Sequence, residues 1–372
     1  MPVYIHQIET GVPETAYDQD YIRDFMKEHV SDNELTKRII HRIYSQSGID
    51  QRHTVIKDFD NDMPVPDFFE SINGSLSMPS TKHRNELYIR EAKKLYIDIA
   101  RRTIDNCRHI DYKDITHVIT VSCTGFFAPG PDYFIVKELN LSPNTHRFHL
   151  GFMGCYATFP ALKMAKSICE SDPSANVLIV SLELCTLHLQ FREESDFLIS
   201  ASLFADGGGG MMVSARIPET SSGIFEMNDF TTTVAPSGEE DMAWTIGNNG
   251  FDMKLSTYVP KIIGENITSI VDPFFNAHKM DKNDIDYWAI HPGGRAIVDN
   301  VQKSLNLTGE QTAASREVLR DFGNMSSATI IFVLKNLLSK PSAHENENVY
   351  AMAFGPGLTI ESGLLTKNPV LD

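Results

Sequence analysis

Apolar positions along the chain alternate between short continuous runs and longer stretches in which they recur at helical spacing. The continuous runs, rich in Val, Ile and Ala, have the composition of buried strands, and the spaced stretches are typical of amphipathic helices. The runs lie at 114–125, 147–150, 175–185, 209–215, 284–294 and 348–357. This alternation predicts an α/β protein whose sheets are covered by helices.

The order of these elements occurs twice along the chain. A strand, a helical stretch that opens with glycine and a second strand follow one another at 114–121, 154–168 and 176–183, and again at 284–291, 323–337 and 348–355. The repeat predicts two related halves, residues 1–220 and 221–372, each built around one βαβ-rich unit.

Cys155 lies between a glycine and a tyrosine, at the point where an apolar run gives way to helical spacing. Apolar residues recur at helical spacing from Phe159 to Cys169, and Pro160 fits the first turn of such a helix. We therefore expect Cys155 at a helix N-terminus, where unpaired N–H groups and the helix dipole favour a thiolate. The alternative is a buried cysteine that only packs as a small apolar side chain.

The repeat also singles out a histidine and an asparagine. Asn324 follows a glycine in the position that corresponds to Cys155, and His291 ends a predicted strand just before a Pro-Gly-Gly turn. Ends of parallel strands are where the sites of α/β proteins form. A thiolate can carry an acyl group, and an imidazole and an amide can stabilise an oxyanion. Structural alternatives are a hydrogen-bonded histidine and a helix-capping asparagine.

The net charge of −16 argues against nucleic acid or an anionic membrane as a general partner. No apolar run is long enough to span a membrane, and the first residues lack a signal-peptide pattern, so we expect a cytoplasmic protein. The cysteines lack CxxC spacing, so neither a disulfide framework nor a zinc site is indicated. They are Cys107, Cys123, Cys155, Cys169 and Cys185.

Four stretches resemble the signatures of the type III polyketide synthases, the chalcone synthase family. They are GFMGCYATFPALKMAKS at 151–167, AIHPGGRAIVD at 289–299, FGNMSSATIIFVL at 322–334 and AFGPGLTIESGLL at 353–365. The resemblance implies a thiolase fold with a layered αβαβα core, a homodimer and a catalytic triad. It implies no metal and no other cofactor.

In this family the triad would consist of Cys155, His291 and Asn324. The resemblance implies that Cys155 carries the acyl starter and then the growing chain, while His291 holds the thiolate as an ion pair. It also implies that His291 and Asn324 stabilise the enolate formed when malonyl-CoA loses carbon dioxide.

The resemblance carries over to residues around the triad. Phe204 matches the phenylalanine that gates the CoA tunnel, and Met253 stands where the plant enzymes have a second gatekeeper phenylalanine. The loop Gly355, Pro356 and Gly357 is similar to the one that shapes the cyclisation cavity. A core aromatic beside a glycine-rich turn is the structural alternative for Phe204.

Arg42 matches one of the cationic residues that meet the CoA phosphates in this family. A lysine that accompanies it in the family is replaced here by Gln46, and Lys37 and Arg38 are candidates to compensate. The structural alternative is that Arg42 only lies on a solvated helix face.

The product class depends on small residues near the predicted cavity. Thr124, Ala128 and Cys185 resemble the trio that lines the acyl tunnel of mycobacterial long-chain alkylpyrone synthases. This likeness predicts a medium or long fatty acyl starter, malonyl-CoA extenders and an alkylpyrone or alkylresorcinol product. Cys123 with Cys185 also resembles the cysteine pair of tetrahydroxynaphthalene synthases, which start from malonyl-CoA alone.

Two further alternatives concern how the starter is delivered and whether the protein is an enzyme at all. An acyl carrier protein rather than CoA could bring the starter to the enzyme. From a different class, a thiolase-fold chain could be a catalytically silent acyl-binding protein, although all three chemical groups of the triad are present.

Overall fold

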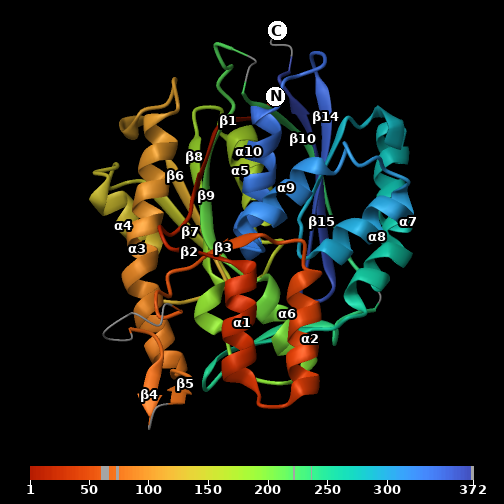
Figure 1. Cartoon of the computed structure of the whole chain (residues 1–372). Helices are drawn as coiled ribbons and strands as arrows, with labels where there is room; N and C mark the ends of the chain where they lie inside the picture. The colour runs from red at the N-terminus through yellow and green to blue at the C-terminus, as the bar shows by residue number, and fades with distance from the viewer. Residues whose placement is uncertain (60–66, 73–74, 221–222, 236, 370–372) are drawn as a thin grey trace.

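A mixed sheet of nine strands runs through the computed structural model, which describes residues 1–59, 67–72, 75–220, 223–235 and 237–369 (Figure 1). The strand order is β13-β14-β15-β10-β1-β9-β8-β6-β7. These strands are β1 (Tyr4–Gly11), β6 (His117–Ser122), β7 (His146–Gly151), β8 (Asn176–Leu184), β9 (Asp206–Ser214), β10 (Phe225–Val234), β13 (Tyr287–Ile290), β14 (Glu347–Gly355) and β15 (Thr359–Lys367).

Three two-stranded sheets and ten α-helices complete the described chain. The small sheets pair β2 (Ala16–Asp18) with β3 (Gln51–His53), β4 (Glu70–Ile72) with β5 (Ser75–Ser77), and β11 (Met242–Gly247) with β12 (Gly250–Leu255). The helices are α1 (Gln19–Val30), α2 (Glu34–Ser45), α3 (Thr81–Asp105), α4 (Pro131–Glu138), α5 (Thr158–Ser171), α6 (Ser195–Leu203), α7 (Val259–His278), α8 (Arg295–Leu305), α9 (Ala313–Phe322) and α10 (Thr329–Ser339).

The nine-stranded sheet confirms the predicted repeat. In the first half β6 and β8 are parallel neighbours with α5 between them in sequence, and β9 follows antiparallel. In the second half β13 and β14 are parallel neighbours separated by α10, and β15 follows antiparallel. Antiparallel pairing of β1 with β10 joins the two halves into one sheet. The division at residues 220 and 221 falls in the connection between β9 and β10, and as a domain boundary it stays a prediction.

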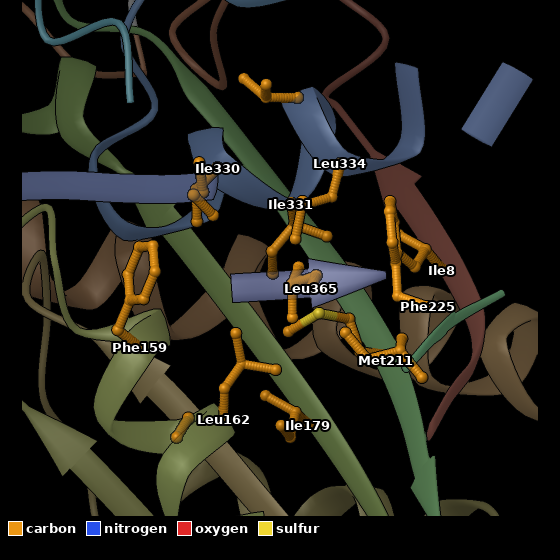
Figure 2. Close-up of a cluster of buried hydrophobic side chains, with 14 of the residues drawn as sticks. Ile8, Phe159, Leu162, Ile179, Met211, Phe225, Ile330, Ile331, Leu334 and Leu365 are labelled. Atoms are coloured by element: carbon orange, nitrogen blue, oxygen red, sulfur yellow. The ribbon is translucent and has the colours of Figure 1, made fainter. Parts of the chain in front are cut away.

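The two central helices, α5 and α10, pack between the strands of both halves. One buried cluster contains Phe159 and Leu162 of α5, Ile331 of α10, Ile179 of β8 and Leu365 of β15 (Figure 2). Helix α3 covers the opposite face of β8 and β9, and α7 and α8 pack on the opposite face of the second half. Helices and strands therefore alternate in the αβαβα layers expected from the sequence.

Strand β8 shows why the core strands have continuous apolar sequences. Val177 and Ile179 face the central helices, while Leu178 and Val180 face α3, and every residue of the strand is buried. A strand covered on both faces needs apolar side chains at both phases of the pleat.

Both central helices begin later than the sequence suggested. Helix α5 starts at Thr158 and α10 starts at Thr329, so Cys155 and Asn324 lie in the turns ahead of these helices. The short helix Ser326–Ala328 occupies the residues between Asn324 and α10. The prediction that these two residues sit at helix N-termini is therefore wrong in detail. No helix of the described ranges combines the length and apolarity that crossing a membrane requires.

Candidate active site

Cys155 is held in the turn ahead of α5 by the glycine before it. Gly154 has φ of +82°, a conformation that glycine adopts without strain, and the Ala157 N–H donates to its carbonyl at 3.1 Å. A Cβ atom at Gly154 would lie 2.6 Å from Cδ of Pro356. Glycine therefore allows the loop 355–357 to pack directly against the turn that carries the cysteine.

The loop itself depends on a second close approach. A Cβ atom at Gly355 would lie 2.5 Å from the Tyr156 ring and 3.5 Å from the backbone nitrogen of Cys155. Gly357 has φ of +126°, which a side chain would strain. Of this loop, Pro356 reaches the cavity that holds the cysteine, whereas the two glycines allow its placement.

His291 directly follows β13, as predicted, and is fixed through its backbone. Its N–H donates to the Met352 carbonyl at 2.8 Å, which extends the pairing of β13 with β14 by one residue. The side chain is 1% exposed, and neither ring nitrogen has a hydrogen-bond partner in the described part of the chain. A buried imidazole without a partner is uncommon, because an unmade hydrogen bond in the interior is costly.

Asn324 is fixed by pairing with the residues around Phe204. Its N–H donates to the Leu203 carbonyl and its own carbonyl accepts from the Ala205 N–H, both at 2.9 Å. The side-chain Nδ2 donates to the Gly293 carbonyl at 3.2 Å, and Oδ1 accepts from the Ser326 N–H at 2.8 Å. These bonds orient the amide and connect Asn324 to the Pro-Gly-Gly turn after His291.

One cavity brings the three predicted catalytic residues together. We call it the central cavity; its open volume is about 570 Å³. It is lined by Cys123, Thr124, Gly154, Cys155, Cys185, Phe204, Met242, Trp244, Met253, Leu255, His291, Gly293, Ile297, Asn324, Ser326, Phe354 and Pro356. The triad thus comes from three segments far apart in the sequence, and both gatekeeper positions line the same space.

The position of Ala128 in an acyl tunnel stays a prediction, because within a single chain this residue lies at the surface. The residue is exposed, just ahead of α4, and it lines neither the central cavity nor the second cavity described below. Thr124 and Cys185, the other two members of the predicted trio, do line the central cavity. The chain leaves the cavity wall after Thr124, because the next residues run outward to the surface before α4 begins.

Burial opposes charge on both the thiol and the imidazole. Burial raises the pKa of Cys155 to about 11, although hydrogen bonding from Ser326 and Asn324 favours the thiolate. Burial lowers the pKa of His291 to about 3. A position ahead of α5 therefore does not by itself favour a thiolate, because burial acts against the charged form of each group. Proton transfer from Cys155 to His291 creates opposite charges together and is a coupled event.

Two buried polar residues behind the triad were not singled out from the sequence. Ser326 has φ of +48°, and its Oγ lies 3.5 Å from the sulfur of Cys123. The carboxylate of Glu183 accepts from the Cys123 N–H at 2.9 Å and from the Thr124 hydroxyl at 2.8 Å. Burial raises the pKa of Glu183. The signal in the sequence was a single acidic residue within the apolar run of β8.

The hairpin β11–β12 forms a wall of the central cavity and was also missed. Met242, Trp244, Met253 and Leu255 of this hairpin line the cavity. Trp244 donates from Nε1 to the Cys123 carbonyl at 2.8 Å, which fastens the hairpin to the end of β6. This hairpin was not predicted from its alternation of apolar and polar residues, although two asparagines and a glycine mark the turn.

A second cavity, which we call the rear cavity, adjoins the central one. Its open volume is about 620 Å³, and the two share Cys185, Phe204, Trp244 and Met253. Its other lining residues are Tyr17, Ile22, Arg52, Thr54, Phe59, Thr186, His188, Leu189, Gln190, Phe197, Ser200, Ala201 and Phe251. The lining surface is predominantly apolar.

A third hollow lies beside α2, and we call it the α2 channel. It has about 770 Å³ of open volume and shares Leu255, Gly293 and Ile297 with the central cavity. Ile43, Gln46 and Arg295 line it as well. It therefore lies between helix α2 and a wall that it shares with the central cavity.

The predicted CoA contact lies near this channel but not within its wall. Arg42 is exposed on α2, one residue before Ile43, and a direct contact with CoA phosphates stays a prediction. Of the two candidates to compensate for Gln46, Lys37 pairs with Glu34 at 3.2 Å, whereas Arg38 is exposed. The described residues contain no group of three or more His, Cys, Asp or Glu side chains placed to hold a metal ion.

Comparison with known proteins agrees with this geometry. Residues 2–216 match the N-terminal domain model of the chalcone and stilbene synthases, and residues 226–369 match the C-terminal domain model. The alpha-pyrone synthesis polyketide synthase-like Pks18 of Mycobacterium tuberculosis is 31% identical over 97% of this chain and 90% of its own length. The type III polyketide synthase B of Arabidopsis thaliana is 34% identical over 74% of this chain and 72% of its own.

Solved structures show the same relationship. The crystal structure of PKS-I from the brown alga Ectocarpus siliculosus superposes with a TM-score of 0.90 at 29% identity and covers 98% of each chain. The 1,3,6,8-tetrahydroxynaphthalene synthase of Streptomyces coelicolor, a bacterial type III polyketide synthase, superposes with a TM-score of 0.85 at 25% identity. The match covers 98% of this chain and 99% of that chain. The chain therefore belongs to the chalcone and stilbene synthase family, the type III polyketide synthases, which are acyltransferases that catalyse decarboxylative condensation.

Proposed function

We propose that this polyketide synthase loads a medium or long fatty acyl starter onto Cys155, extends it with malonyl-CoA and cyclises the product to an alkylpyrone or alkylresorcinol. The observation that carries the proposal is the apolar rear cavity, which adjoins the central cavity across Cys185, Phe204, Trp244 and Met253. The name of the mycobacterial relative, alpha-pyrone synthesis polyketide synthase-like Pks18, supports the same product class.

Loading requires a thiolate, and His291 is the base that the central cavity offers. Its unpartnered ring can take the proton of Cys155 as the sulfur attacks the starter thioester. The new bond joins sulfur to the acyl carbon, the carbon–sulfur bond to the carrier breaks, and the carrier thiolate leaves with a proton. Transfer within the buried pair leaves the net charge of the cavity unchanged, which offsets the penalty that burial sets on each charge alone.

Extension uses the same imidazole together with Asn324. Malonyl-CoA loses carbon dioxide, and the electron pair remains as an enolate whose carbon attacks the acyl carbon on Cys155. The bond from the acyl carbon to the Cys155 sulfur then breaks, the sulfur leaves as a thiolate, and the lengthened chain remains on CoA. One Nδ2 proton of Asn324 is donated to Gly293, which leaves the second to bind the enolate oxygen. The neutral His291 ring supplies another N–H donor, so two donors act where negative charge develops.

The rear cavity would hold the hydrocarbon part of the starter. Each buried methylene contributes about 0.8 kcal/mol, so a tail that fills this space adds binding free energy that a short starter lacks. Phe59, Phe197 and Phe251 supply much of the apolar wall.

A tetrahydroxynaphthalene-type synthase is the second candidate, and one observation favours it. Cys123 and Cys185 both line the central cavity, as the resemblance to those enzymes implies. Such an enzyme starts from malonyl-CoA alone, and the rear cavity would then have no role in its reaction.

We also propose that the active form is a homodimer built on the β7 side of the sheet. Strand β7 ends the sheet order and pairs with β6, and its residues 146–149 are exposed. Phe126, Tyr133 and Phe148 are each between 37% and 39% exposed near this edge. An open strand edge with apolar neighbours is suited to pairing with a second chain.

The cysteines support a reducing compartment such as the cytoplasm. All five are free and buried, and none is engaged in a disulfide.

The test is a mass spectrum of the products formed with malonyl-CoA, alone and with acyl-CoAs from acetyl to stearoyl. We expect product masses that track the added starter, with the highest kcat/KM for medium or long chains. A single aromatic product from malonyl-CoA alone, unchanged by added acyl-CoA, would replace this proposal with the tetrahydroxynaphthalene candidate.

A further inference from the structure

Helix α2 has one face in the core and one face in solvent. Thr36, Ile40 and Tyr44 are buried against the body of the protein. The outward face consists of residues spaced by three or four positions, Leu35, Arg38, Ile39, Arg42, Ile43 and Gln46. We call it the α2 face. Leu35 is 65% exposed and Ile39 is 42% exposed, so the face combines apolar and cationic side chains.

The arginines of the α2 face have no acidic neighbour to neutralise them. Lys37, on the flank of the helix, pairs with Glu34 at 3.2 Å. For Arg38 and Arg42, by contrast, no ion pair occurs with any residue that the structure describes, and both side chains are exposed. In a chain with a net charge of −16, this is a local surface suited to an acidic partner.

The α2 face ends at the opening of the α2 channel. Ile43 and Gln46 belong to both, and Arg295 lies on the channel wall. On another side of the opening, Tyr258 is 65% exposed directly before Val259, which also lines the channel. A partner seated on the α2 face would therefore stand at the opening of a channel that shares a wall with the central cavity.

The size and polarity of the face distinguish a protein partner from a free nucleotide. From Leu35 to Gln46 the face runs 11 residues along the helix, about 17 Å at 1.5 Å per residue. The nucleotide end of CoA is compact and hydrophilic, so it can meet Arg38 or Arg42 but leaves Leu35 and Ile39 uncovered. A helix of an acidic protein can cover both the apolar and the cationic positions.

We propose that the α2 face docks an acidic acyl carrier protein, which delivers the starter on a phosphopantetheine arm through the α2 channel. This inference rests on the proposed function. The acyl group moves from the sulfur of the arm to the sulfur of Cys155. The proton taken up by His291 returns to the sulfur of the arm, which leaves as a free thiol on the carrier.

The test compares one acyl group on three donors: lauroyl-carrier protein, lauroyl-CoA and lauroyl-pantetheine. Acylation of Cys155 is followed by intact-protein mass spectrometry, and kcat/KM is measured for each donor. We expect the carrier protein to exceed pantetheine by roughly tenfold or more at low ionic strength, because local charge complementarity raises the association rate. Raising the salt concentration should lower the rate with the carrier selectively.

Two variants separate docking from chemistry. Arg38→Glu removes a positive charge from the α2 face, and Ile39→Ser removes an apolar contact. We expect each to lower kcat/KM for the carrier protein by roughly tenfold and to leave lauroyl-pantetheine unchanged, because pantetheine has no body to dock. The matched control is Lys113→Glu, an equally drastic charge reversal at a side chain that is 79% exposed and lines none of the three cavities.

Three results would overturn the inference. One is a carrier protein no better than pantetheine, and another is an equal slowing of all three donors by Arg38→Glu and Ile39→Ser. The third is binding to phosphatidylglycerol vesicles that both variants abolish, without any preference for the carrier, which would make the α2 face a membrane contact. If wild-type protein is acylated by none of the donors, the proposed function fails and this inference fails with it.

Discussion

The two cavities each contain a buried histidine, and the difference between them shows what distinguishes a structural residue from a reactive one. His188 in the rear cavity contacts the Thr124 carbonyl through Nε2 at 2.8 Å and accepts from the Phe251 N–H through Nδ1 at 3.0 Å. His291 in the central cavity has no partner on either nitrogen among the described residues. One ring joins two segments of backbone, and the other remains available for a ligand.

The pKa alone does not separate the two histidines. Burial lowers the pKa of both His188 and His291 to about 3. Hydrogen-bond satisfaction does separate them, because a buried imidazole seldom leaves both nitrogens without a partner. Among the described residues His6 shares this feature, but only His291 of the two lines the central cavity with Cys155 and Asn324. The cost of that arrangement is explained if a substrate supplies the missing partners.

The largest effect is expected for the replacement of Cys155, which should abolish the chemistry of the central cavity and leave the rear cavity intact. Cys155→Ala should reduce chain extension below detection, because it removes the thiol that carries the acyl chain in the proposed mechanism. Loss of carbon dioxide from malonyl-CoA should continue, since the two enolate-binding groups remain. Gas release and product mass spectra measure the two steps separately. Persistent polyketide formation in the variant would remove Cys155 from the mechanism.

The next effect tests the histidine comparison directly. His291→Gln should lower kcat by a factor on the order of 10²–10⁴ with little change in Tm, because it removes a proton acceptor but breaks no bond. His188→Gln should instead lower the stability by about 1–3 kcal/mol, because buried backbone groups of Thr124 and Phe251 lose their partner. Steady-state kinetics and thermal unfolding on both variants provide the test. Equal kinetic loss in the two would show that partnering does not mark function.

The junction between the cavities gives the third prediction. Cys185→Phe should extend a ring into the passage and exclude about four methylenes, which at ~0.8 kcal/mol each is roughly 3 kcal/mol, or on the order of 100-fold in kcat/KM for lauroyl-CoA. An acetyl starter, which stays in the central cavity, should be affected much less. Cys185→Ser keeps the size and controls for the thiol. Equal loss for acetyl and lauroyl starters, with a lower Tm, would indicate overpacking instead.

The features that could be predicted from the sequence are those that depend on hydrophobic periodicity and on motifs. The alternation of apolar runs identified the core strands, and the repeat placed Gly154 and Gly323 in corresponding turns, where both have positive φ. The turns themselves were not predictable, because Ser326 adopts a left-handed conformation and the short helix after Asn324 replaces the first turn of α10.

The walls of the cavities were harder to predict than the triad. Thr124 and Cys185 line the central cavity of this chain, whereas Ala128 is exposed in it, so a role of Ala128 in the tunnel stays a prediction. Trp244 and Arg52 reach the rear cavity from a hairpin and from β3, and no periodicity in the sequence connects these segments.

A smaller effect follows from the low pKa of His291. In the folded chain burial lowers this pKa from about 6.5 to about 3, so below pH 6.5 the unfolded chain binds a proton that the folded chain does not. This contribution to stability is complete above pH 6.5 and is lost as the pH falls toward 3, by about 2 kcal/mol at pH 5. Urea unfolding at pH 7 and pH 5 should show His291→Gln less acid-sensitive than wild type by that amount. Identical acid sensitivity would mean that His291 is already protonated in the fold.

The smallest effect concerns Trp244, which belongs to both cavities and fastens the hairpin β11–β12 to the Cys123 carbonyl. Trp244→Phe removes the Nε1 donor but keeps a ring beside His188 and Phe251, so we expect a loss of about 1 kcal/mol in unfolding free energy and an unchanged starter preference. Trp244→Ala removes the ring as well and should widen the passage toward longer starters. If Trp244→Phe alters chain-length preference as much as Trp244→Ala, the hydrogen bond rather than the ring sets the passage. The hairpin would then be positioned by one contact, and the separation of the two cavities would depend on how β11–β12 is held.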